Sequence, residues 1–455
     1  MRHSSHLHLH FHTHHRAARY DVDMTKGSIT KHLINFALPL MVGNLFQQLY
    51  NMVDTWVVGN YVSNEAFSAV GTVTPIINTL IGFFLGLSSG AGVVISQYYG
   101  AHRPEKVREA VHTAMLLTVI MGVVFTGVGI AMTPLMLELM KTPAEVAPDQ
   151  TAYLTIYFAG IMGLLLYNMG SGILRAVGDS RRPFYFLLVS AVLNTGLDLL
   201  FVLKFGMGVE GVAYATIIAQ AVSAALTIWV LMRAAGCIRV ELRALRMTWS
   251  VLRQIVSVGI PAALQMAITA FSNVFVQGYI NYFGPDCMSG WTAYTKVDQL
   301  VILPVQSIAM AGTTFVGQNY GAGKPDRVRK SYFIALAYSF GVGLVLGGSL
   351  FLFGREFLAL FTTEAAVIDA GMKRVQVMGL AYCISAFMDC TIAASRGLGK
   401  TIVPTVIVIM GSCVFRVIWV YSIFAHFHTI PSLYLLYPCS WALTAIAEII
   451  YFIHC

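Results

Sequence analysis

Two aspartates lie inside long apolar runs of this sequence, where a carboxylate is costly. Asp54 ends the stretch LYNMVD at 49–54, and Asp198 follows Asn194 by four residues. Side chains four apart project from the same face of a helix, so the Asn194 amide and the Asp198 carboxylate should act together. If these runs cross a bilayer, a charge at its centre costs roughly 2.5–3.5 kcal/mol and usually faces the protein interior. Both aspartates are therefore candidate functional groups.

A polar stripe leads up to the first aspartate. Gly43, Gln47, Tyr50 and Asp54 are spaced i, i+4, i+7 and i+11, which places them on one face of a helix with 3.6 residues per turn. Other interpretations remain open: Asp54 could cap a kink, and Asp198 could lie solvated near the membrane surface.

If the two carboxylates face each other, they cannot both stay ionised cheaply, because burial and like-charge repulsion act against the charged forms. The pair must then share a proton or hold a cation. Sodium would accept the carboxylate oxygens of Asp54 and Asp198 and the amide oxygen of Asn194, whereas a proton needs only the carboxylates. The sequence does not decide between the two ions.

The composition indicates where these groups lie. The chain has 455 residues, of which 57% are hydrophobic and 11% charged, whereas a soluble domain has about 25% charged residues. Its mean hydropathy is +0.71. About 20 apolar residues cross a hydrocarbon core roughly 30 Å thick. We find twelve such runs and predict an all-α integral membrane protein, with spans near 33–57, 66–95, 110–134, 151–174, 183–203, 211–232, 255–281, 291–316, 331–353, 376–395, 402–424 and 432–453.

Lysine and arginine concentrate in alternate loops. The loops at 101–109, 175–182, 233–253, 322–330 and 396–400 are basic, and the positive-inside rule places them in the cytoplasm. We expect a multi-pass protein of the plasma (inner) membrane, monomeric and surrounded by lipids, with both termini cytoplasmic. The net charge of +8 then reflects topology and lipid headgroups, and we expect no nucleic-acid partner.

The chain is internally duplicated. SQYYGAHRPEKVR at 96–108 and GQNYGAGKPDRVR at 317–329 are identical at seven of thirteen positions at an offset of 221, and ILRAVGDSRRP at 173–183 matches AASRGLGKTIVP at 393–404. Six helices per half give both halves the same orientation. We predict two homologous six-helix lobes around a central cleft, an N-lobe at 24–235 and a C-lobe at 236–455. Residues 1–23 hold seven of the thirteen histidines; a natural metal site is conceivable, but we interpret them as a tag or an over-extended start before Met24.

The two halves differ where the aspartates lie. At an offset of 222 Asp54 meets Val276, and at 221 Asp198 meets Trp419. The acid-pair chemistry should therefore reside in the N-lobe. The C-lobe has its own intramembrane charges, for which salt bridging is the default role and substrate contact or gating the alternative: Lys296, Asp298, Asp389 and Arg416.

Two further features concern motion and the cleft. Pro39, with Gly43 one turn later, could hinge the first helix and move Asp54, although many membrane helices carry a structural proline. Side chains on the first and seventh helices are candidates for lining the cleft, although methionines and aromatics at helical spacing also serve in packing. The candidates are Gln47, Tyr50, Met52, Gln265, Met266, Phe271 and Asn273.

The opening FALPLMVGNLFQQLYNMVDTWVVG, the twin loops, and the RAVGDSRRP and RGLGK segments resemble the multidrug and toxic compound extrusion family, from about Met24 to the C-terminus. Within it the chain is most similar to the branch of DNA-damage-inducible protein F and staphylococcal-type drug exporters. That resemblance implies an N-lobe cation site made by Asp54, Asp198, Asn194, Asn168, Tyr153 and Thr216, with Pro39 as the bending proline. The acidic residue that other branches carry in helix 7 has no counterpart between Pro261 and Tyr282.

The resemblance also implies a function. We expect a proton- or sodium-coupled antiporter that exports lipophilic, often cationic drugs by alternating access, without a cofactor. A flippase for lipid-linked precursors in the same superfamily is the alternative. An enzyme is disfavoured, because the chain has no His-Glu-x-x-His motif and few charged positions within the predicted spans.

Overall fold

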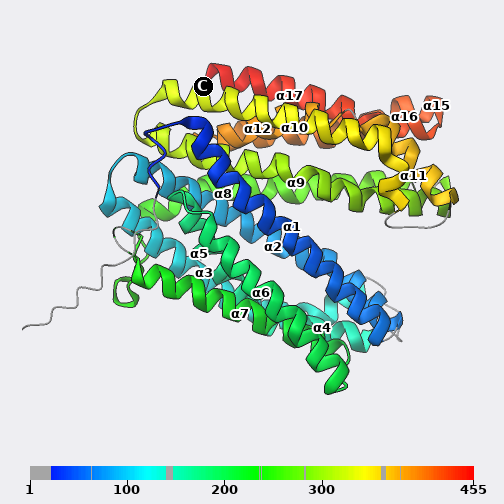
Figure 1. Ribbon diagram of the computed structural model, residues 1–455, viewed down its shortest axis with the longest axis horizontal. Helices are drawn as coiled ribbons and strands as arrows, with labels where there is room; N and C mark the ends of the chain where they lie inside the picture. The colour runs from blue at the N-terminus through cyan, green and yellow to red at the C-terminus, as the bar shows by residue number, and fades with distance from the viewer. Residues whose placement is uncertain are drawn as a thin grey trace, which may run out of the picture.

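A computed structural model describes residues 22–62, 64–139, 147–234, 236, 238–280, 283–359, 365–379 and 381–455. Its elements are helices joined by short loops (Figure 1). The N-terminal half contains α1 (Ile29–Tyr61), α2 (Asn64–Gly100), α3 (Pro104–Leu139), α4 (Ala147–Ala159), α5 (Ile161–Ala176), α6 (Arg181–Leu199), the π-helical η1 (Leu200–Lys204) and α7 (Val209–Arg233).

After the short η2 (Leu242–Ala244), the second half begins with four helices: α8 (Trp249–Ile280), α9 (Pro285–Gly321), α10 (Pro325–Ala359) and α11 (Ala365–Met378). It continues with α12 (Tyr382–Gly397), α13 (Ile402–Val408), the π-helical η4 (Ile409–Val414), α14 (Phe415–Trp419) and the π-helical η5 (Val420–Phe424). It ends with α15 (Ala425–Phe427), α16 (Ile430–Tyr434) and α17 (Leu436–His454).

The twelve predicted spans are confirmed, each as one helix or one interrupted helix. Among the described residues nine helices are long and apolar enough to cross a membrane, and two bent pairs raise the number to eleven. One pair is α4 and α5, which meet at 49°. The remaining span is α1, which carries more polar side chains. The tenth span begins earlier than predicted, at Ala365, because Lys373 and Arg374 interrupt its apolar run without ending the helix.

The duplication is visible in the geometry as well as in the sequence. Ser180 donates a hydrogen bond to the Phe36 carbonyl oxygen at 2.8 Å, and 221 residues later Thr401 donates to the Ser257 carbonyl oxygen at 3.3 Å. In Figure 1 the two halves form two lobes that diverge toward the end where α4 and α11 lie. The predicted two-lobed, all-helical fold is confirmed.

The twin loops close their helices in the same way. After α2 and α9 the chain turns through a left-handed residue, His102 (φ 55°) in one loop and Gly323 (φ 69°) in the other. The backbone amides of His102 and Arg103 bond back to the carbonyl oxygens of Tyr99 and Tyr98, as expected for a helix that ends in a left-handed turn. We call the end of the molecule that carries these loops the twin-loop end, and the opposite end the far end.

The two lobes are joined closely at the twin-loop end. The Gln97 side-chain amide donates to the Gly397 carbonyl oxygen at 2.9 Å, and the equivalent Gln318 donates to Ala176 at 3.1 Å. Glycine lets the helix ends approach: a Cβ at Gly100 would lie 1.7 Å from the Gln318 carbonyl oxygen. These reciprocal contacts close the cleft at this end.

The segment before α1 also crosses this closed end. The backbone amide of Val22 bonds the Val177 carbonyl oxygen of the N-lobe at 2.7 Å, while the Met24 amide bonds Gln318 Oε1 of the C-lobe at 2.9 Å. Burial opposes ionisation of Asp23, but hydrogen bonds from Thr25 outweigh it and hold the pKa of Asp23 below its ordinary value. Val22 and Asp23 therefore contact the fold, while residues 1–21 of the predicted extension lie outside the described residues.

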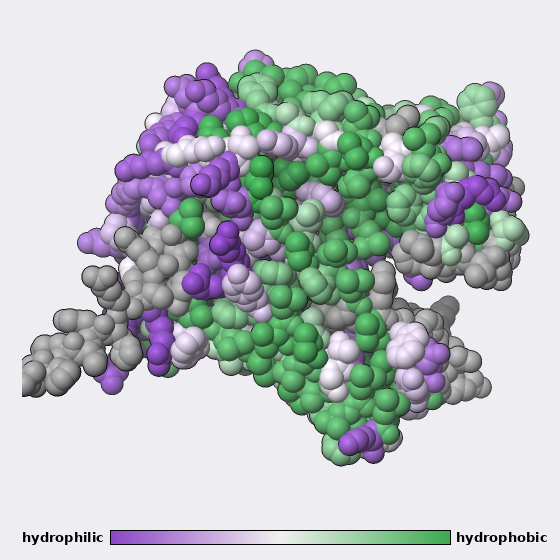
Figure 2. Space-filling view, in the orientation of Figure 1, coloured by the Kyte–Doolittle hydropathy of each residue, from purple (hydrophilic) through white to green (hydrophobic). Residues whose placement is uncertain are grey.

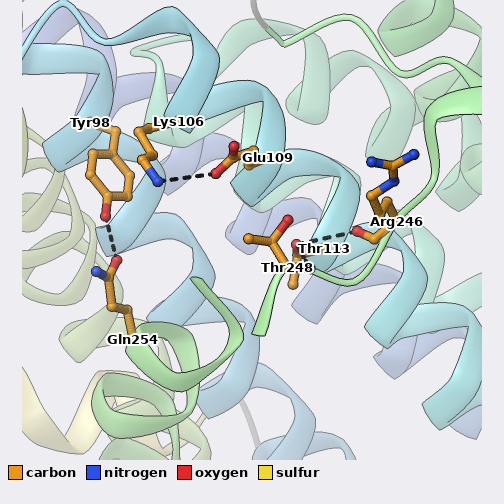
Figure 3. A network of polar contacts seen from close by, with 7 residues as sticks. All are labelled: Tyr98, Lys106, Glu109, Thr113, Arg246, Thr248 and Gln254. Atoms are coloured by element: carbon orange, nitrogen blue, oxygen red, sulfur yellow. Dashed lines mark hydrogen bonds and ion pairs between the residues drawn. The ribbon is translucent and has the colours of Figure 1, made fainter. Parts of the chain in front are cut away.

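The chain between the lobes is anchored on the N-lobe. Figure 3 shows Thr113 of α3 donating to the Arg246 carbonyl oxygen at 3.4 Å and accepting from the Thr248 amide at 3.2 Å. In the same view Tyr98 of α2 donates to Gln254 of α8 at 2.7 Å. The basic linker thus packs against α2 and α3.

The surface has the pattern of a membrane protein. Figure 2 shows hydrophilic residues gathered at the twin-loop end and a smaller hydrophilic group at the far end, with an apolar band between them. A notch separates the lobes at the far end in this view. Exposed apolar side chains such as Val192, Val345 and Leu352 belong to helices that pass through this band.

Candidate functional site

The two aspartates of the apolar runs lie together where α1 packs on α6. Asn194 donates its side-chain amide to Asp54 Oδ1 at 2.8 Å. Asp198, one turn later on α6, is completely buried, and its carboxyl group lies within hydrogen-bonding reach of that of Asp54. The packing of two helices far apart in sequence thus brings together two carboxyl groups and one amide.

This cluster contains more acceptors than donors. Both oxygens of Asp198 and the Oδ1 of Asn194 are buried and receive no hydrogen bond from a donor among the described residues. Two ionised carboxylates can only accept, so they cannot satisfy each other. A shared proton or a small cation between the groups would satisfy the cluster, because either supplies positive charge to the unpartnered oxygens.

A multivalent metal site is less well supported. No group of three or more His, Cys, Asp or Glu side chains that could hold a metal is found in the part of the chain that the structure describes. A sodium ion here would need the Asn194 amide oxygen beside the two carboxylates. The carboxylate oxygens of Asp54 and Asp198 and the amide oxygen of Asn194 are oxygen ligands, the kind that hard cations accept.

The other N-lobe residues predicted for the cation site have local partners. Thr216 donates to the Val212 carbonyl oxygen of its own helix, α7, at 3.0 Å. Tyr153 is buried and stacks on Tyr157 with ring centroids 6.1 Å apart. The backbone carbonyl oxygen of Asn168 accepts from Ser88 of α2 at 3.5 Å. Asn194 is therefore the residue of this set for which the structure describes a hydrogen bond to the acid pair.

The first helix is continuous through its proline. Pro39 lies inside α1, and a Cβ on Gly43 would lie 3.3 Å from Phe184 of α6, so the two helices touch one turn after the proline. Gln47 is half-buried farther along α1. The side chains of Tyr50 and Met52 lie outside the described residues. The hinge at Pro39 stays a prediction.

A cavity of about 590 Å³ lies between the lobes, which is the size of a typical small-molecule pocket. Of the predicted cleft residues, Gln265 and Met266 line it, together with Asp389. The side chain of Phe271 lies outside the described residues. Asn273 instead accepts a hydrogen bond from Arg416 at 2.9 Å.

The C-lobe charges have varied surroundings. Asp298 accepts a hydrogen bond from the Tyr382 hydroxyl, and Asp389 accepts one from Ser385 at 3.3 Å. Lys296 is exposed. Arg416 is buried and contacts Ser272, Asn273 and Ser440, so its described partners are hydroxyls and an amide and not a carboxylate.

The C-lobe positions equivalent to the acid pair are occupied by different chemistry. Val276, the counterpart of Asp54, is completely buried and apolar. Trp419, the counterpart of Asp198, donates its indole N–H to the Ser432 carbonyl oxygen at 2.7 Å. Acid pairing is thus confined to one lobe at these two positions.

Sequence reasoning missed the surroundings of several charged residues. Arg175 and Arg396, assigned to basic loops by the positive-inside rule, line the central cavity. Glu448, completely buried, lies inside the last span, where a single acid in an apolar run was the available signal. Arg374 of α11 is buried with its guanidinium carbon 3.5 Å from the Trp291 ring centroid, a contact without a sequence signal.

Comparison with known families identifies the fold. The family model described as MatE matches the chain twice, over residues 39–200 and 261–422, which together make up more than half of it. The chain belongs to the MatE family. The two matches are offset by 222 residues, as the internal duplication predicts. The MatE assignment makes the protein a multi-pass membrane transporter and not an enzyme.

Among relatives in the MatE family, the probable multidrug resistance protein YpnP of Bacillus subtilis is 29% identical over 361 residues, which cover 79% of this chain and 80% of the relative. The probable multidrug resistance protein NorM of Thermotoga maritima is 29% identical and covers 83% and 82%. A solved structure described as the outward-facing conformation of a multidrug resistance MATE family transporter has a TM-score of 0.88 and 24% identity over 95% of this chain and 97% of its own. That structural likeness shows the shared fold.

Proposed function

We propose that this protein exports small lipophilic, often cationic molecules across the plasma membrane in exchange for protons or sodium ions. The relatives named as multidrug resistance proteins support export of such compounds. The observation that carries ion coupling is the buried cluster of Asp54, Asn194 and Asp198, whose oxygens outnumber their donors. A cluster of this kind needs a positive charge, and its occupant can change as the protein changes state.

The charge distribution supports an orientation. Arg103, Lys106, Arg327 and Lys330 lie in or beside the twin loops, so the positive-inside rule places this end in the cytoplasm. The N-terminal segment crosses the same end, and the helix count is even, so both termini are cytoplasmic in this proposal. The conformation described above is then closed to the cytoplasm and directed outward.

In this conformation a cation from outside would reach the acid pair. Only differential binding between two states can drive transport. A proton or sodium ion at Asp54 and Asp198 lowers the negative charge of the pair by one unit and weakens its attraction for a cationic substrate in the cleft. Cation arrival from outside therefore favours substrate release on that side, and cation loss to the cytoplasm favours substrate uptake there.

The test is ethidium transport in proteoliposomes with sodium and pH gradients set independently. Wild type should move ethidium against its gradient when at least one ion gradient is imposed. Asp54→Asn and Asp198→Asn should lose most of the ion-driven component. Asp369→Asn is a matched control, because Asp369 is an exposed carboxylate paired with Arg355. Undiminished ion-driven transport in both site variants would refute the coupling role.

A further inference from the structure

The central cavity contains a pair of arginines related by the duplication. Arg175 ends α5 in the N-lobe, and Arg396, 221 residues later, ends α12 in the C-lobe. Both line the cavity of about 590 Å³ between the lobes. Each is half-buried, and the cavity is the space that both share.

These guanidinium groups lack full charge partners. The ion pairs among the described residues join Lys106 with Glu109, Arg108 with Glu241, Arg182 with Asp179, and Arg355 with Asp369, and Arg175 belongs to none of them. Arg396 lies in the field of Asp389 and Glu448, yet its Nε has no acceptor among the described residues. An arginine enclosed between the lobes without an ion-pair partner is costly, and charged groups of this kind mark substrate or ion pathways.

The rest of the cavity suits an amphipathic molecule. Its lining carries hydroxyl groups, including those of Ser89 and Thr314, and apolar side chains that include Leu85, Met266 and Met310. Asp389 is the acid among the lining residues, so the described lining carries two positive charges and one negative charge. A ligand with an apolar body and one anionic group would match this lining.

We propose that Arg175 and Arg396 form a subsite that binds the carboxylate or phosphate group of an amphipathic substrate. A guanidinium group presents paired N–H donors that match both oxyanions. The inference rests on the proposed export function and names the residues that would hold the anionic group when a substrate is zwitterionic. The same chemistry would also accept the phosphate of an anionic lipid.

The test measures binding of three probes to purified protein in detergent micelles. The probes are norfloxacin, which carries a carboxylate, its methyl ester, which does not, and dihexanoyl phosphatidylglycerol. Arg175→Gln should weaken norfloxacin binding by about tenfold or more, since a hydrogen bond to a charged group is lost, and should leave the ester within about twofold of wild type. Arg175→Lys should recover part of the loss, because lysine keeps the positive charge but lacks the paired N–H donors of arginine.

Arg181→Gln is the matched control, because Arg181 is an exposed arginine at the start of α6. Equal loss of norfloxacin and ester binding in Arg175→Gln would overturn the subsite, because the effect would then be structural. Arg175-dependent binding of phosphatidylglycerol would support it with lipid as the source of the anion. If wild type binds neither drug probe while the lipid binds through Arg175, the export proposal fails and the subsite stands.

Discussion

Replacing Gly100 by alanine tests how the twin-loop end closes. An added Cβ would lie 1.7 Å from the backbone carbonyl oxygen of Gln318, and at the equivalent Gly321 it would lie 1.8 Å from that of Gln97. A backbone oxygen at a helix end cannot rotate away. The ends of α2 and α9 must therefore separate by more than about 1 Å before the repulsion is relieved.

Such overpacking typically costs about 1–3 kcal/mol. The cost applies only to the conformation in which the two helix ends meet, so it acts on the equilibrium between conformations. At about 1.4 kcal/mol per tenfold change, Gly100→Ala should shift that equilibrium by about fivefold to about 150-fold toward states open at the twin-loop end. The separation would also stretch the bonds from Gln97 to Gly397 and from Gln318 to Ala176.

Hydrogen–deuterium exchange in lipid nanodiscs measures this shift, in peptides that span 96–103 and 317–324. Gly312→Ala is the control, because Gly312 lies inside α9 and a Cβ there meets no atom within 4 Å. Gly312→Ala gains about 1 kcal/mol of helix propensity inside α9, and Gly100→Ala gains less because Gly100 is the last residue of α2. Exchange should rise in Gly100→Ala alone. The same exchange in Gly100→Ala as in wild type would refute the reasoning.

Three further predictions concern other contacts. Asn194→Leu removes the hydrogen bond to Asp54 and should weaken ion-driven ethidium transport in proteoliposomes by about fivefold to tenfold; unchanged transport would show that the amide has no part in the site. Gln97→Leu removes one hydrogen bond between the lobes and Gln318→Leu removes two, to Ala176 and from Met24. Both should increase exchange at the twin-loop end, with the larger effect in Gln318→Leu; a larger effect of Gln97→Leu would contradict this ranking. Arg416→Met should lower the free energy of unfolding by about 2 kcal/mol, since it removes bonds to Ser272 and Asn273, and should leave the ion dependence of transport intact; a changed ion dependence would place Arg416 in coupling.

Much of the fold follows from local features of the sequence. Hydropathy alone yields the twelve spans, and the repeat of SQYYGAHRP as GQNYGAGKP predicts two equivalent lobes. The side chains of Asn194 and Asp198 share a helix face by spacing alone. Their contact with Asp54 depends on the packing of α1 against α6, and the sequence separation of 140 residues gives no direct signal for it.

The contacts that sequence reasoning missed depend on tertiary structure. From the sequence alone, Gly100 and Gly321 look like ordinary glycines beside a loop. Only the structure, which brings the ends of α2 and α9 into contact, shows that a side chain would not fit there. Arg175 lies next to a basic loop, and the positive-inside rule assigns such residues to the surface, although the lobes enclose it in a cavity. The contact of Arg374 with Trp291 was missed because the two residues lie on different helices, so no local sequence pattern indicates it.

The central claim is that substrate binding displaces the cation from the acid pair, and that the cation displaces substrate. Linkage requires that a cation which lowers substrate affinity is itself displaced by substrate to the same degree. Ethidium affinity of purified protein, measured across sodium concentration and pH, tests this most directly. Wild type should lose affinity as one of the two cations rises, and Asp198→Asn should show a flat response. An unchanged cation dependence in Asp198→Asn would contradict the account.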